Sequence, residues 1–79
     1  MASRKRLQYD IRMMPRERLG QITIRGAEFE VYTTGERGWL LFCPMIPMGD
    51  RNNPTWVSST IQIPIRSSDL KPGWWKGLH

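Results

Sequence analysis

Side chains able to perform acid–base or metal chemistry are few in this sequence and lie far apart. The chain has one histidine, His79, and one cysteine, Cys43. A histidine at the last position lacks the packed neighbours that hold a general base in place. One cysteine and one histidine are also too few ligands for a structural zinc site. We therefore expect no enzymatic activity, no cofactor and no bound metal.

The carboxylates and glycines point the same way. Glu28 and Glu30 lie two residues apart, so they share the outward face of an expected strand. Such a pair is able to hold a divalent ion, but carboxylates on a strand face are usually solvated. Asp50 and Asp69 stand alone in turns, and the glycines do not form a phosphate-binding loop ahead of a helix. The pattern favours a binding protein over a catalyst.

Positive charge is concentrated near the N-terminus. The formal net charge is +5, and residues 1–18 carry six basic and two acidic side chains, a net of +4. The remaining six basic side chains face five acidic ones in residues 19–79, a net of +1. Clustered cations raise the local potential and speed encounter with polyanions. The expected partner is therefore nucleic acid or an acidic protein surface.

Four tryptophans in a chain of 79 residues leave some indole surface exposed. Trp74 and Trp75 are adjacent, so in an extended segment one of them faces outward and is able to stack on an unpaired base. No signature of base-specific recognition is present, so binding through phosphates with little sequence preference is expected. The predicted nucleic-acid-binding residues are Arg4, Lys5, Arg6, Arg12, Arg16, Arg18, Lys71, Trp74, Trp75 and Lys76.

Two alternatives remain open. The first is a protein-binding inhibitor or adaptor, such as a phage-encoded protein that blocks a host nucleoprotein complex. It would bind through a loop whose apolar root needs cover. Its predicted contact residues are Met45, Ile46, Met48, Arg51, Asn53 and Trp56. The second is a structural subunit that forms homo-oligomers by adding its edge strand to a neighbouring sheet.

Alternating hydrophobicity predicts three consecutive strands in the middle of the chain. Residues 21–25 and 28–32 alternate polar and apolar side chains around a two-residue turn at Gly26-Ala27. Residues 39–43 are nearly all apolar, which is typical of a strand covered on both faces. Cys43 ends this run and is expected to pack as a small hydrophobic side chain. The predicted inner face of the first two strands comprises Ile22, Ile24, Phe29 and Val31.

The flanking segments have weaker patterns. Residues 7–13 alternate, which favours a strand over a helix with similar spacing, and Pro15–Gly20 suggests one helical turn. The proline- and glycine-rich residues 44–54 indicate a surface loop, and residues 67–73 a capped turn. Residues 56–65 predict an edge strand that contains Pro64. Its expected inward side chains are Val57, Ile61, Ile63 and Ile65.

Together these elements predict a mostly β fold of about five strands, in a small barrel or a bent antiparallel sheet, with a short helical turn and an irregular C-terminal segment. We expect a basic flexible arm at residues 1–6 and a single domain at residues 7–79. No secretory signal and no run of ~20 apolar residues is present. A cytoplasmic protein that does not enter a membrane is expected.

Overall fold

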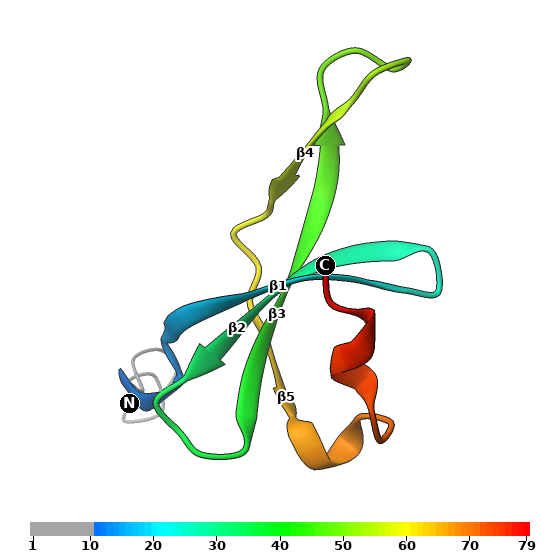
Figure 1. The fold of residues 1–79 in the computed structure, drawn as a ribbon. Coiled ribbons are helices and arrows are strands. Elements are labelled where there is room, and N and C mark those ends of the chain that lie inside the picture. Colours follow the sequence, from blue (N-terminus) through cyan, green and yellow to red (C-terminus); the bar gives the residue numbers. More distant parts are fainter. Residues whose placement is uncertain (1–10) are drawn as a thin grey trace, which may run out of the picture.

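The computed structural model describes residues 11–79, and its five antiparallel strands form one sheet that curls into a half-barrel (Figure 1). This confirms the predicted fold class. The strands are β1 (Pro15–Ile24), β2 (Ala27–Thr34), β3 (Trp39–Met48), β4 (Thr55–Ser58) and β5 (Ile63–Arg66). Three short 3₁₀ turns complete the described part of the chain: η2 (Ile11–Met13), η3 (Ser67–Asp69) and η4 (Trp74–Gly77).

The β1–β2 hairpin turns one residue earlier than predicted. Ile24 pairs with Ala27, so the two loop residues are Arg25 and Gly26 and not Gly26 and Ala27. Both loop residues have positive φ, 50° and 82°. These values fit a type I′ turn, whose twist matches that of the flanking strands. The hairpin therefore requires Gly26 at its second loop position, where a side chain would be strained.

β1 is also longer than predicted. The expected helical turn at Pro15–Gly20 is wrong, because this segment is the first half of β1 and pairs with β2 up to Thr34. Proline is tolerated at the first residue of a strand, where no ladder amide is needed. The strand predicted at residues 7–13 is wrong in its described part, since Ile11–Met13 forms a 3₁₀ turn. Residues 7–10 lie outside the described residues.

The core lies on the concave face of the half-barrel, around β2 and β3. Val31 pairs with Phe42, and these are the largest fully buried side chains. Ile22 and Leu40 complete the buried cluster. Residues 39–43 form a strand as predicted, and Leu41 and Cys43 are buried on its opposite face. Ile24 was expected to face the core, but it lies beside the turn and is exposed.

The predicted loop at residues 44–54 is shorter in the structure. β3 continues to Met48, and only residues 49–54 connect it to β4. The strand predicted at residues 56–65 is divided into β4 and β5, because residues 59–62 lie opposite only residues 43–44 of β3. Ile65 packs against the core as predicted. The other three side chains expected to face inward are exposed, namely Val57, Ile61 and Ile63.

The C-terminal segment returns beneath the sheet and closes the open side of the half-barrel (Figure 1). Trp74 and Trp75 lie in η4 and not in an extended segment as predicted. The Trp74 ring packs 6.2 Å from Phe42, whereas Trp75 is 56% exposed, so one indole does face outward. The amide of His79 donates to the carbonyl of Gln21 at 2.8 Å, and the amide of Gln21 donates to His79 at 2.9 Å. The last residue therefore pairs with the outer edge of β1.

Candidate protein-binding surface

The last part of β3 separates from the rest of the sheet. The β2–β3 ladder ends where Phe29 pairs with Pro44, and Met45–Met48 pairs only with β4. Residues 45–58 thus form a two-stranded ribbon, here named the β3–β4 arm. Figure 1 shows it projecting away from the half-barrel. The arm joins the half-barrel through β3, which is continuous, and through residues 59–62, which lead from β4 to β5.

Both faces of the β3–β4 arm are apolar. Ile46 pairs with Val57, and these two side chains share one face with Met48. Pro47 pairs with Trp56 on the opposite face. All five side chains are exposed, with Met48 at 53% and Trp56 at 47%. A two-stranded ribbon is marginally stable by itself in water, so these faces gain most from being covered.

The tip of the β3–β4 arm is an ordered turn. The Asp50 side chain accepts the amide of Asn52 at 2.9 Å, and the Asp50 carbonyl accepts the amide of Asn53 at 3.1 Å. Gly49 has a φ of 88° at the start of this turn. Arg51 lies at the tip and is exposed, and no ion pair is present for it within residues 11–79. The tip therefore presents the Arg51 cation beside the Asp50 carboxylate, ahead of the apolar faces.

The base of the β3–β4 arm is held by the carboxylate of Glu30. This group accepts hydrogen bonds from the Ser58 hydroxyl at the base of the arm, from Tyr32 Oη at 3.0 Å and from Arg18 Nε at 2.5 Å. The hydrogen bond from Ser58, followed by that from Arg18, lowers the pKa of Glu30. The expectation that Glu30 faces solvent is therefore wrong, since its side chain is only 14% exposed.

Cys43 is buried as predicted. Burial and the nearby charge of Glu30 raise the pKa of the Cys43 thiol. A raised pKa keeps the thiol protonated and unreactive near neutral pH. Cys43 thus acts as a packing residue below the base of the arm.

Replacing Glu30 with glutamine is expected to destabilise the protein near neutral pH by about 1 to 2 kcal/mol, because three donors lose a charged acceptor. The folded-state pKa of Glu30 lies below its ordinary value of 4.5. Its stabilising effect is therefore complete above that value and is lost as the pH falls through the folded-state pKa. The difference in unfolding free energy between wild type and Glu30→Gln should shrink over this acidic range.

Urea unfolding at a series of pH values measures this difference. Glu28, whose pKa is also lowered, chiefly by the hydrogen bond from Thr23, is present in both proteins, so its titration cancels. A difference that stays constant with pH would contradict the assigned role of Glu30.

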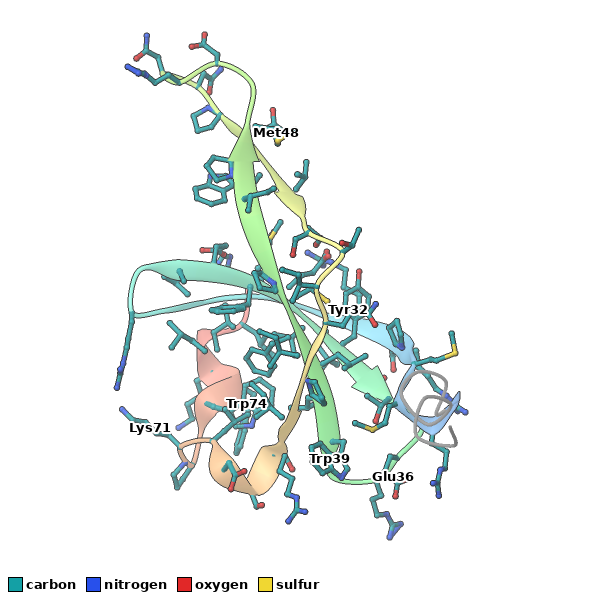
Figure 2. The ribbon with its side chains drawn as sticks, turned by 180° about the vertical axis from the view of Figure 1, so that it is seen from behind. Tyr32, Glu36, Trp39, Met48, Lys71 and Trp74 are labelled. Atoms are coloured by element: carbon teal, nitrogen blue, oxygen red, sulfur yellow. The ribbon has the colours of Figure 1, made fainter. Side chains whose placement is uncertain are left out.

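The residues predicted to bind protein all lie in the β3–β4 arm. The structure brings Met45, Ile46 and Met48 onto β3, opposite Trp56 on β4, with Arg51 and Asn53 in the connecting turn. Figure 2 shows Met48 far from Tyr32 on β2 and from Trp74, which packs against the core. This set therefore lies on one projecting arm, with Ile46 and Met48 on one face and Met45 and Trp56 on the other.

The residues predicted to bind nucleic acid are spread more widely. Arg12 forms an ion pair with Glu36 at 3.4 Å, and Figure 2 places Glu36 and Lys71 at opposite sides of the half-barrel. Arg18 is bonded to Glu30, and Trp74 packs in the core. Arg16 lies on β1, Trp75 and Lys76 lie on η4, and Arg4, Lys5 and Arg6 lie outside the described residues.

Residues 11–79 contain no group of three or more His, Cys, Asp or Glu side chains placed to hold a metal ion. No helix within this range is long and apolar enough to cross a membrane.

Comparison with protein-family models, with curated proteins and with solved structures finds no match to this chain. The fold defines a small β half-barrel protein with a projecting apolar arm.

Proposed function

We propose that this protein is a small protein-binding inhibitor or adaptor that inserts its β3–β4 arm into an apolar cleft of a partner protein. The observation that carries the proposal is that both faces of the arm are apolar and exposed. Tryptophan, methionine and arginine are enriched at the centres of protein interfaces, and Trp56, Met48 and Arg51 provide all three. The arm therefore has the composition of a contact surface.

The positive charge of this chain favours a partner whose cleft has an acidic border. Arg51 leads the arm, and the whole chain carries a net charge of +5. A positive protein approaches a negative surface faster than a neutral one, and two copies of this chain repel each other. A different, acidic protein is therefore favoured over a second copy of this chain.

Site-specific cross-linking tests the proposal. A photoreactive amino acid is introduced at Met48 in the full chain, which is expressed in its natural host cells, and cross-linked products are identified by mass spectrometry. The same amino acid at the exposed Trp75 serves as the control. We expect one protein to be cross-linked at Met48 and not at Trp75, and then to bind in purified form. Equal cross-linking at both positions would contradict an interface on the arm.

Nucleic-acid binding is a second candidate, favoured by cations that have no ion pair within residues 11–79: Arg16, Arg25, Arg37, Lys71 and Lys76. Fluorescence anisotropy with single-stranded and duplex oligonucleotides at two salt concentrations tests it. Binding that weakens steeply with salt, and that is lost in the Arg12→Glu/Arg16→Glu double variant, would support this candidate. Unchanged affinity in the double variant would contradict it.

A further inference from the structure

A recess lies between the end of β1 and the C-terminal segment, away from the β3–β4 arm. It is a groove of about 600 Å³, within the usual size range of ligand sites. Its apolar lining includes Phe42, Leu70 and Trp74. Four consecutive residues of the β1–β2 hairpin, 22–25, line the other side. We name this recess the β1 groove.

The backbone edge of β1 faces the β1 groove. Alternate side chains of a strand point to opposite faces, so consecutive residues line one recess only when the strand edge itself borders it. The Thr23 side chain lies on the other face, where its hydroxyl donates to Glu28 Oε1 at 2.6 Å. Thr23 therefore lines the groove with its main chain.

The pairing of the C-terminus shows which main-chain groups point outward. Gln21 exchanges both hydrogen bonds with His79, so its amide and carbonyl point away from β2. The amide and carbonyl of successive residues point alternately to the two sides of a strand. Those of Thr23 therefore point the same way as those of Gln21, two residues earlier. Among the described residues, the main chain of His79 hydrogen-bonds only to Gln21, because the preceding chain turns away into η4 at Gly77. Within residues 11–79, no hydrogen bond joins the main chain of Thr23 to a segment outside the strands.

Cations border the same groove. Arg25 and Lys71 both line it, and neither has an ion pair within the described residues. Asp69 is the one carboxylate among the described residues that line it. The border therefore has a net positive charge next to an apolar floor. A ligand with an apolar side chain for the floor and carboxylates for the border would therefore complement the groove.

We infer that the β1 groove binds an extended segment of an acidic peptide from a partner protein. The peptide main chain pairs with Thr23 as a short added strand, continuing the edge that His79 begins. An apolar peptide side chain packs against Phe42 and Trp74, and flanking carboxylates lie beside Arg25 and Lys71. The free amide and carbonyl of the strand edge favour a peptide, because nucleic acid has no main-chain amide to pair with them. No part of this inference depends on the arm.

The probe is a fluorescein-labelled peptide with the sequence Gly-Glu-Val-Phe-Glu-Gly, titrated into the full chain and followed by anisotropy. The first control peptide has lysine in place of both glutamates. The second is N-methylated at its central residues, which removes the amide donors that a strand needs. We expect the acidic peptide to bind at least about tenfold more tightly than either control.

Protein variants locate the site. The Arg25→Glu/Lys71→Glu double variant should weaken binding of the acidic peptide by about tenfold or more, whereas Trp56→Ala on the arm should leave it unchanged. Exchange of the Thr23 amide with solvent should slow when the peptide is bound. Equal binding of the lysine peptide, full affinity in the double variant, or unchanged exchange at Thr23 would overturn the inference. Loss of binding in Trp56→Ala would place the peptide on the arm and also overturn it.

Discussion

Replacing Phe42 with alanine is expected to lower the free energy of unfolding by about 3 to 5 kcal/mol, the usual cost of removing a buried phenylalanine ring. Phe42 is 1% exposed and packs between Phe29, with ring centroids 5.9 Å apart, and Trp74, at 6.2 Å. The ring thus joins β2, β3 and the C-terminal segment. Its removal leaves a cavity at the point where these three elements meet.

A folded chain of this length has a stability of roughly 4 to 12 kcal/mol, at roughly 0.05 to 0.15 kcal/mol per residue. Phe42→Ala is therefore expected to remove at least about a quarter of the total stability. Urea unfolding followed by tryptophan fluorescence and far-ultraviolet circular dichroism measures the change. The control is Ile61→Ala, at a side chain that is 57% exposed, with an expected change within about 0.5 kcal/mol. Similar costs for both substitutions would contradict the assigned core.

Replacing Trp56 with alanine is expected to weaken binding to the cross-linked partner by about 2 kcal/mol or more, which is roughly a 30-fold loss of affinity. Trp56 has the largest apolar side chain of the β3–β4 arm, and it does not belong to the buried core. The unfolding free energy should therefore change by only about 0.5 kcal/mol.

Trp75→Ala is the matched control for this prediction. It removes an indole of similar exposure, 56% against 47%, from η4 and not from the arm. Isothermal titration calorimetry should show wild-type affinity in Trp75→Ala and reduced affinity in Trp56→Ala. The reverse result would move the interface to the C-terminal segment.

Short-range alternation was sufficient to predict the centre of the sheet. Gln21–Arg25 and Glu28–Tyr32 alternate as half-buried strands, and these strands are present. Pro15–Gly20 has the local pattern of a helical turn, but pairing with residues up to Thr34 makes it a strand. Such pairing depends on residues distant in sequence, so it cannot be predicted from the local pattern of side chains.

The second half of β3 was not predicted, because it contains two prolines. Pro44 and Pro47 suggested a loop because they begin a segment rich in turn-forming residues. In the structure they lie in a strand that has only one neighbour beyond Pro44, and the Pro44 carbonyl still accepts the amide of Ser59 at 2.9 Å. A proline is tolerated where its missing donor would point to an unpaired edge. The position of that edge becomes known only when the whole sheet is assembled.

The side chains that we propose as contact residues of the β3–β4 arm were selected from the sequence, but their surroundings were not predicted. Glu30 and Ser58 are 28 positions apart, and nothing in the sequence links them. The β1 groove depends on His79 returning to Gln21 across the length of the domain. The sequence thus pointed to candidate side chains, whereas the two proposed sites depend on long-range pairing.

In the proposed function, the β3–β4 arm binds the partner while the half-barrel folds without the arm. The most direct test replaces residues 46–57 with Asn-Gly, which joins the cross-strand partners Met45 and Ser58 by a favoured type I′ turn. Titration calorimetry with the cross-linked partner should detect no binding, and circular dichroism should show a folded protein with nearly unchanged thermal unfolding. A folded, armless protein that binds the partner with wild-type affinity would contradict the account.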